Sequence, residues 1–217
     1  MIYIFGDSFS QRHIDFTEPC NVRDYVRWKG YEPKMFYDYI SEDLNQSIEN
    51  YSKGGMCNEY ILMKFMEQYH KIQLNDMVIF GWTHISRYLI PNPADNKWIT
   101  NLYNTNQYLS QSSKDEIDMM RCHPLYEKKQ LDVIDFINTL LPHNRTIHWT
   151  WCTENSEDLL SITKETNGMI SDYHYGEEGH RDLYGRITNE LRDTDKVRLN
   201  LWEHPIFVNP EGVRRTP

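Results

Sequence analysis

Cysteine is scarce in this sequence, and its spacing excludes two classes of small, cross-linked protein. The chain of 217 residues has 4 cysteines, which lie far apart and form no Cys-x-x-Cys pair. Disulfide frameworks and zinc cages rely on more numerous or more closely spaced cysteines. We therefore expect free thiols at Cys20, Cys57, Cys122 and Cys152.

Long apolar runs and clusters of basic residues are also missing. No run approaches the roughly 18 apolar residues of a membrane-spanning helix, and the mean hydropathy is −0.72, so no membrane contact is expected. The 23 basic and 32 acidic side chains give a net charge of −9 without a basic stripe, which argues against binding nucleic acid. The first residues do not resemble a signal peptide, so the sequence predicts a cytoplasmic protein. It predicts no oligomeric state.

What the chain does contain is typical of a globular protein of one domain. Hydrophobic residues make up 39% and aromatic residues 13%, enough to fill a sizeable core. No repeat, low-complexity tract or break in composition divides the chain. We expect one domain over residues 1–192 and a C-terminal tail over residues 193–217 that packs on this domain or on a partner.

Short apolar runs that end at glycine alternate with stretches of helical spacing. The spacing predicts strands at residues 2–5, 47–51, 76–80 and 146–152, with a short fifth strand at 168–170. It predicts helices at residues 33–44, 57–72, 124–141 and 177–191. This alternation indicates βαβ units and therefore a parallel sheet covered on both faces. In such sheets ligands bind beyond the carboxyl ends of the strands, here the loops 6–10, 52–58 and 81–87.

The first of these loops contains the string Gly6-Asp7-Ser8. A serine at a sharp turn after a strand can expose its hydroxyl, but it needs a base to remove its proton. Near the C-terminus, His174 could be that base, with Asp172 beside it. A serine, a histidine and an aspartate within reach of one another perform acyl transfer, whatever their order in the chain.

Four separated blocks together make the sequence similar to the SGNH (GDSL-type) hydrolases. They are Gly6-Asp7-Ser8, the glycine-containing residues 50–58, the string Gly-Trp-Thr-His at 81–84, and Asp-Tyr-His at 172–174 followed by Gly179-His180. With the strand and helix order, the likeness covers most of residues 1–192. It implies a three-layer α/β/α sandwich with a five-stranded, mostly parallel sheet of the flavodoxin-like type.

The resemblance assigns roles to individual residues of this chain. Ser8 is the expected nucleophile and His174 the base, with Asp172 as the acid that orients it. The backbone N–H groups of Ser8 and Gly55 are the expected oxyanion donors. Thr83 stands where the family commonly has an oxyanion-binding asparagine. The string Gly-Trp-Thr followed by an arginine looks like a divergent branch of the family. Residue type, not the resemblance, suggests substrate binding by Trp82 as a pocket wall and by Arg87 as the partner of an acidic substrate group.

The acid departs from the family pattern. The family usually places its aspartate three residues before the histidine, a position held here by Ser171. Asp172 is only two residues before, so it reaches the histidine ring only if the segment is extended or Tyr173 compensates. We expect Asp172 to accept a hydrogen bond from Nδ1 of His174. If Ser171 or a backbone carbonyl holds the ring instead, the site is a Ser–His dyad.

These features favour a serine esterase that acts on a small-molecule or carbohydrate ester without a cofactor, the acyl group being acetyl or another short chain. The alternative is a binding module for a glycan or a protein partner that has the same fold and degenerate chemistry. A metal site at His84, His174, His180 and Asp172 ranks third, because the His-Glu-x-x-His pattern is absent.

Several candidate residues also have plainer interpretations. Ser8 could simply cap a helix, and we expect Asp7 to stabilise its loop by accepting backbone N–H bonds. Thr83 could be an ordinary turn residue, and Trp82 a packing residue. Arg87 could pair with a local carboxylate such as Asp95 instead of an acidic substrate group, and a local carboxylate is the more common partner of an arginine. His148 and Cys152 are expected to pack in the core.

Overall fold

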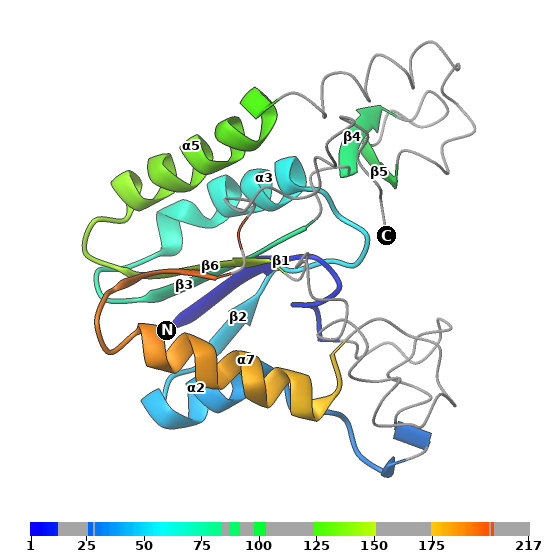
Figure 1. Ribbon diagram of the computed structural model, residues 1–217, viewed down its shortest axis with the longest axis vertical. Coiled ribbons are helices and arrows are strands. Elements are labelled where there is room, and N and C mark those ends of the chain that lie inside the picture. Colours follow the sequence, from blue (N-terminus) through cyan, green and yellow to red (C-terminus); the bar gives the residue numbers. More distant parts are fainter. Residues whose placement is uncertain are drawn as a thin grey trace, which may run out of the picture.

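A parallel sheet of five strands forms the centre of the protein, with helices on both faces (Figure 1). The computed structural model describes residues 1–12, 26–27, 29–83, 87–91, 98–102, 124–150, 175–199 and 201. The strand order is β2-β1-β3-β6-β7, and every neighbouring pair is parallel. This is the doubly wound order of flavodoxin-like proteins, so the predicted three-layer α/β/α sandwich is confirmed.

The elements agree closely with the expected ones in the first 83 residues. The sheet consists of β1 (Ile2–Gly6), β2 (Ile48–Asn50), β3 (Met77–Trp82), β6 (Arg145–Thr150) and β7 (Lys196–Leu199). The helices are α2 (Phe36–Leu44), α3 (Asn58–Gln68) with the 3-10 turn η1 (Tyr69–Lys71), α5 (Pro124–Leu140) and α7 (Glu177–Glu190). No helix in the described part of the chain is long and apolar enough to cross a membrane.

Side chains alternate between the two faces of the sheet and build two separate cores. Ile2 and Ile4 of β1 join the core under α2 and α7, whereas Tyr3 and Phe5 join the core under α3 and α5. The same alternation runs along β3 and β6 because successive side chains of a strand point to opposite faces. Figure 1 shows the two helix layers, α3 and α5 on one side and α2 and α7 on the other.

The edge strand β7 lies beyond the boundary expected at residue 192. Val197 is fully buried in the core, and Leu201 is buried in the core on the other face. The sheet therefore continues to Leu199, and residues 193–199 belong to the domain. The fifth strand predicted at residues 168–170, like the tail after Leu201, lies outside the described residues.

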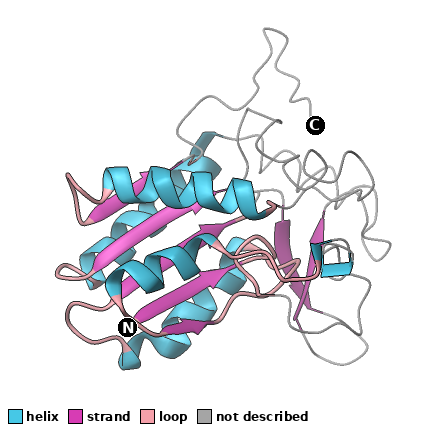
Figure 2. Ribbon diagram, turned by 90° about the horizontal axis from the view of Figure 1, so that it is seen from below, coloured by secondary structure: helices cyan, strands magenta, loops and turns pink. Residues whose placement is uncertain are grey.

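An antiparallel hairpin, β4 (Arg87–Pro91) with β5 (Trp98–Leu102), follows β3 and was not predicted. It lies beyond the carboxyl ends of the sheet strands in both views (Figure 1 and Figure 2). The hairpin therefore stands at the edge of the sheet where ligands bind in folds of this type.

Two glycines on adjacent strands make room for the side chain of Ser10 at this edge. The register pairs Gly6 with Gly81. A Cβ atom added at Gly81 would lie 2.2 Å from Ser10 Oγ and 3.2 Å from the Trp149 ring, and one at Gly6 would lie 2.6 Å from Ser10 Oγ. The loop after β1 thus folds back over the strand ends because neither strand carries a side chain there.

We expect Gly81→Ala to lower the free energy of unfolding by about 3 kcal/mol, because a buried side chain would have to be displaced. Gly54→Ala is the matched control, since its Cβ would meet chiefly the flexible end of Gln11, at 2.9 Å. We expect it to cost less than about 1 kcal/mol. Urea denaturation measures both values. Equal midpoints for Gly81→Ala and the wild type would contradict the close approach.

His148 is a neutral, fully buried histidine in the core under α3 and α5. Its Nδ1 accepts a hydrogen bond from Trp82 Nε1 at 3.2 Å, and its Nε2 lies 3.2 Å from Asn138 Oδ1. Burial, with smaller contributions from Arg198 and Lys196, lowers the pKa of His148 to about 3. The packing role expected for His148 is confirmed; Cys152 lies outside the described residues.

The buried histidine makes stability depend on pH. Between an unfolded pKa of about 6.5 and the folded pKa of about 3, only the unfolded state binds this proton. The contribution of His148 to the free energy of unfolding is therefore complete above about pH 6.5. It is lost as the pH falls, by at most about 1.4 kcal/mol per pH unit. Urea denaturation over this pH range should show that the free energy of unfolding falls more steeply with decreasing pH for the wild type than for His148→Gln. Parallel curves would contradict the prediction.

Candidate active site

The chain turns sharply after β1, and Ser8 lies within this turn. The N–H groups of Ser10 and Gln11 both donate to the carbonyl oxygen of Asp7, at 3.1 and 3.0 Å, so the turn is helical in form. Ser8 is partly exposed, whereas Asp7 and Ser10 beside it are fully buried. The predicted arrangement of a serine at a sharp turn after the first strand is therefore present.

Asp7 is fully buried and has a partner for each carboxylate oxygen. Its Oδ1 accepts the Phe9 N–H at 3.0 Å, which is the loop-stabilising role expected for Asp7. Its Oδ2 accepts a hydrogen bond from Arg87 Nη1, also at 3.0 Å. Arg87 therefore pairs with a local carboxylate, and that carboxylate is Asp7. Asp95, the partner suggested by the sequence, lies outside the described residues.

The glycine loop after β2 lies directly against the serine turn. The Lys53 N–H donates to Gly6 O at 3.0 Å, and the Gly54 N–H donates to the side chain of Gln11. A Cβ atom added at Gly54 would lie 3.6 Å from Cβ of Ser8. The structure thus brings together two blocks that lie more than 40 residues apart in the sequence.

Gly55 is the glycine of this loop that has a left-handed backbone conformation. Its φ of +75° is in the left-handed region, which favours glycine. Within the described residues its N–H has no acceptor, whereas the N–H of Gly54 is taken by Gln11. Of the two glycines, Gly55 is therefore the one with a donor available for an oxyanion.

Thr83, at the end of β3, is held by Asn58 at the start of α3. The Thr83 N–H donates to Asn58 Oδ1 at 2.8 Å, and Asn58 Nδ2 donates to Thr83 O at 3.3 Å. The Thr83 hydroxyl is buried and has no hydrogen-bond partner in the described part of the chain. The backbone N–H of Thr83 already donates to Asn58, so only the Thr83 hydroxyl could act as a third oxyanion donor.

Trp82 is a core residue. Its side chain is 1% exposed, and its ring stacks on Phe80 and His148. The indole N–H is donated to His148. This burial favours the packing interpretation of Trp82; its binding of substrate stays a prediction.

The predicted base and acid, His174 and Asp172, lie outside the described residues, as do Ser171 and His84. The next residue along, Tyr175, is buried, and its ring contacts the Phe9 ring edge-on with centroids 5.5 Å apart. Phe9 directly follows Ser8 in the sequence. The chain neighbours of the predicted nucleophile and of the predicted base are therefore in contact.

His180 packs among aromatic rings in the first turn of α7. It is buried in α7, where its ring stacks on Phe36 and meets Tyr175 edge-on. Among the described residues, no three His, Cys, Asp or Glu side chains are grouped as they would be to hold a metal ion.

Cys57, at the start of α3, is a second nucleophilic residue close to the glycine loop. It is a free cysteine, as expected, and it is fully buried. Burial raises the pKa of its thiol to about 12, so it carries no thiolate near neutral pH. Because the thiolate is the reactive form, Ser8 is the better candidate nucleophile.

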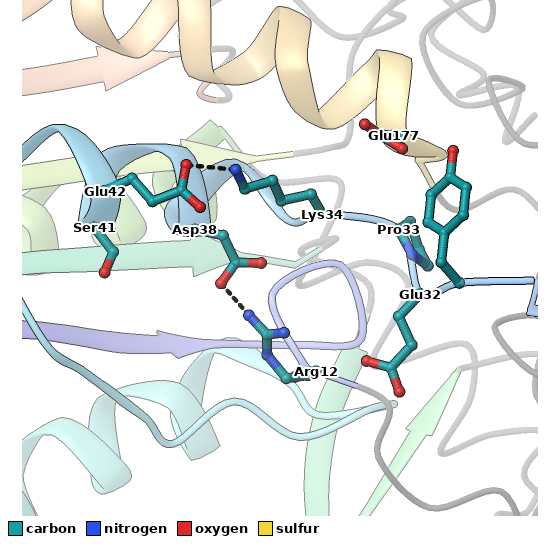
Figure 3. A pocket seen from close by; sticks show the side chains of 9 residues that line it. Arg12, Glu32, Pro33, Lys34, Asp38, Ser41, Glu42 and Glu177 are labelled. Carbon is teal, nitrogen blue, oxygen red and sulfur yellow. Dashed lines mark hydrogen bonds and ion pairs between the residues drawn. The ribbon is translucent and has the colours of Figure 1, made fainter.

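An open groove of about 500 Å³ lies between the N-terminal ends of α2 and α7 (Figure 3). Arg12, four residues after Ser8, forms one wall, and Glu177, three residues after His174, forms another. Arg12 is paired with Asp38, and Lys34 with Glu42. The half-exposed ring of Tyr31 also lines the groove. Its lining is therefore rich in hydrogen-bonding groups.

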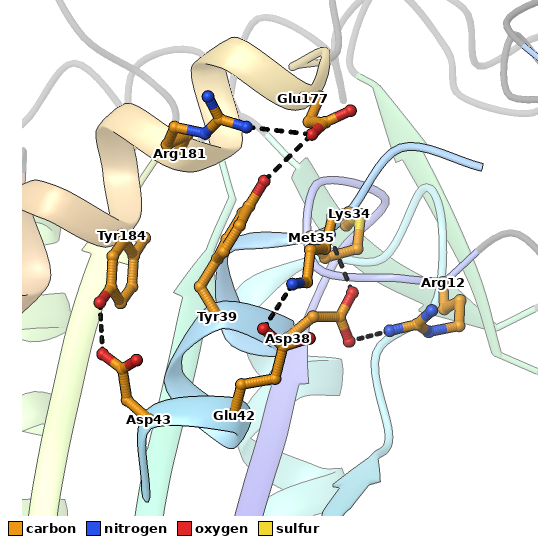
Figure 4. Close-up of polar contacts among 10 residues, drawn as sticks. All are labelled: Arg12, Lys34, Met35, Asp38, Tyr39, Glu42, Asp43, Glu177, Arg181 and Tyr184. Carbon is orange, nitrogen blue, oxygen red and sulfur yellow. Dashed lines mark hydrogen bonds and ion pairs between the residues drawn. The ribbon is translucent and has the colours of Figure 1, made fainter. Parts of the chain in front are cut away.

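Polar contacts join the two helices that flank the groove (Figure 4). Tyr39 donates to Glu177 Oε1 at 3.3 Å, and Arg181 Nη2 reaches the same oxygen at 3.2 Å. Further along, Tyr184 donates to Asp43. These contacts fix the start of α7 and hence the point where the chain leaves the segment that contains His174.

Sequence reasoning missed two residues that shape this site, Gln11 and Asn58, and one contact, the pairing of Asp7 with Arg87. Asn58 is the last residue of the glycine-containing block 50–58 and lies in the first turn of the helix expected at residues 57–72, a signal that could have drawn attention to it. The Asp7–Arg87 pair joins residues 80 positions apart, and no local pattern reports such a contact.

A scan against protein-family models found no match, and a search of curated proteins found none either.

Proposed function

We propose that the protein is a serine esterase of the SGNH (GDSL-type) kind that hydrolyses a carboxylic ester. The observation that carries this proposal is the meeting of three separate segments. The Ser8 turn lies against the Gly54–Gly55 loop, and Phe9 contacts Tyr175, the residue after His174. Because successive Cα atoms are about 3.8 Å apart, these contacts support a site that contains both Ser8 and His174.

In the proposed reaction, His174 removes the proton of Ser8, and Ser8 Oγ attacks the ester carbonyl. The N–H groups of Ser8 and Gly55 hold the resulting oxyanion, with the Thr83 hydroxyl as a third candidate donor. His174 then gives the proton to the leaving alcohol, which leaves an acyl group on Ser8. A water molecule, deprotonated by His174, attacks this acyl group and releases the acid and free serine. No step needs a cofactor.

The groove beside α2 and α7 supports a polar alcohol as the leaving group. Its carboxylates can accept hydrogen bonds from hydroxyl groups, while Arg12 and Lys34 can donate them. The exposed ring of Tyr31 offers an apolar surface of the kind on which a sugar can lie. An acetyl or other short acyl group on a carbohydrate is therefore the proposed substrate class.

The test is an assay of the purified protein with a short-chain p-nitrophenyl ester and with an acetylated oligosaccharide. We expect the release of p-nitrophenol from the first and of acetate from the second. Failure of well-folded protein to hydrolyse either ester would contradict the proposed function.

One observation favours the alternative, a binding module of the same fold. In the third loop, the Thr83 N–H donates a hydrogen bond to Asn58 Oδ1, and the Thr83 hydroxyl is buried. If that hydroxyl cannot reach an oxyanion, two backbone donors remain, and losing one donor typically costs about 10²–10³ in turnover. A protein that binds an oligosaccharide without hydrolysing its ester would have this second function.

A further inference from the structure

We infer that Arg87 is a positioning residue that holds the loops of the candidate active site together, instead of a residue that binds substrate. This inference rests on the proposed esterase function. It concerns a contact that joins the first loop, the glycine loop and the start of the hairpin that follows the third loop.

Arg87 lies at the end of the third loop, residues 81–87, and contacts the other two loops, residues 6–10 and 52–58. It is the first residue of β4, four positions after Thr83. Its Nη1 donates to Asp7 Oδ2 at 3.0 Å, in the loop that contains Ser8. The same nitrogen lies 3.4 Å from the carbonyl oxygen of Met56, the residue after Gly55. One guanidinium group therefore joins the segments that contain the nucleophile and the oxyanion donor.

The contact with Asp7 bears directly on the shape of the serine turn. Asp7 accepts the Phe9 N–H with one oxygen and Arg87 with the other, so the carboxylate is held from both sides. Ser8 lies between Asp7 and Phe9 in the chain. A carboxylate fixed in this way fixes the backbone on either side of the nucleophile.

The contact with Met56 acts on the glycine turn in the same manner. The Met56 N–H lies 3.4 Å from Lys53 O, which closes the turn around Gly55. Arg87 binds the carbonyl group of the same residue and so anchors the end of this turn. The direction of the Gly55 N–H follows from the position of that turn.

Burial and charge argue against a substrate-binding role. The Arg87 side chain is 12% exposed and Asp7 is fully buried, so their charges compensate each other away from water. An acidic substrate would have to compete with a carboxylate already in place. Arg87 thus acts on the reaction through the loops that it holds.

The experiment compares wild type with Arg87→Ala, Arg87→Lys and the control Arg145→Ala, whose arginine pairs with Asp195 on the surface. Steady-state kinetics use one neutral and one acidic short-chain ester. We expect Arg87→Ala to lower kcat about 100-fold for both esters, the effect of a slight misplacement of reacting groups, with little change in KM. Arg87→Lys keeps a positive charge beside the buried Asp7, so it is the variant that should still fold if Arg87→Ala does not. We expect it to recover part of kcat.

A second readout does not depend on activity. Hydrogen exchange of the backbone amides should speed up in Arg87→Ala in residues 7–11 and 53–57 together, and remain unchanged in Arg145→Ala. A rise in KM confined to the acidic ester, with unchanged exchange in both loops, would overturn the inference and make Arg87 a substrate-binding residue. If the wild type hydrolyses no ester, the proposed function fails. Unchanged exchange in Arg87→Ala would then also overturn the inference that Arg87 holds the loops together. Faster exchange in both loops of Arg87→Ala would support that inference.

Discussion

Ser8→Ala is expected to reduce ester hydrolysis by about 10⁴-fold or more while leaving the protein folded. Removing the nucleophile of a catalytic triad removes the covalent pathway, and only substrate binding and oxyanion stabilisation remain. Ser8 is partly exposed in a turn that is closed by hydrogen bonds from Ser10 and Gln11 to Asp7, so the substitution removes none of these backbone bonds. Steady-state turnover of a short-chain p-nitrophenyl ester measures the effect, and circular dichroism checks the fold.

Ser10→Ala provides the matched control, because it removes the other serine hydroxyl of the same turn. Ser10 is fully buried, and its hydroxyl has no hydrogen-bond partner among the described residues. Removal of such a group is close to neutral for stability, and turnover should stay within a few-fold of the wild type. Turnover by Ser8→Ala equal to that of Ser10→Ala would contradict a serine mechanism.

Asp172→Asn is expected to lower kcat by about 10³–10⁴-fold, because an amide in place of the carboxylate favours the wrong tautomer of the catalytic histidine. This prediction depends on the assignment of Asp172 as the acid that accepts the Nδ1 hydrogen bond of His174. Saturation kinetics with the same ester give kcat for the variant.

Ser171→Ala is the comparison for this variant, since Ser171 stands where the family usually has its aspartate. We expect it to change kcat little. A nearly silent Asp172→Asn would show that another group holds the ring, and the site would then act as a Ser–His dyad.

The sequence was sufficient to predict the parallel sheet and its helices, because the signals involved are local. Apolar runs that stop at Gly6 and Gly81 identify buried strands, and both glycines lie at strand ends that pair in register. The edge strand β7 was missed because its sequence, Lys-Val-Arg-Leu, has a single fully buried side chain, Val197. Such a short alternation is easily read as part of a polar tail.

The candidate site was predictable as a set of loops, but its internal contacts were not. The position of the serine turn beside the glycine loop follows from parallel strands whose carboxyl ends meet at one edge. The burial of Asp7 with Arg87, and of Asn58 with Thr83, depends on tertiary packing across 80 and 25 positions. Residue type alone left open whether Arg87 pairs with an acidic substrate group or with a local carboxylate, and the structure identifies Asp7 as a partner.

The central claim is that Ser8 is an activated nucleophile, and reaction with a fluorophosphonate probe tests it most directly. An ordinary serine hydroxyl is inert toward such a probe, whereas one activated by an adjacent base forms a stable covalent adduct. We predict that the folded wild-type protein is modified once and that peptide mass spectrometry places the adduct on Ser8. Heat-denatured protein and Ser8→Ala should remain unmodified. Folded wild-type protein that forms no adduct, or forms it at another residue, would contradict the account.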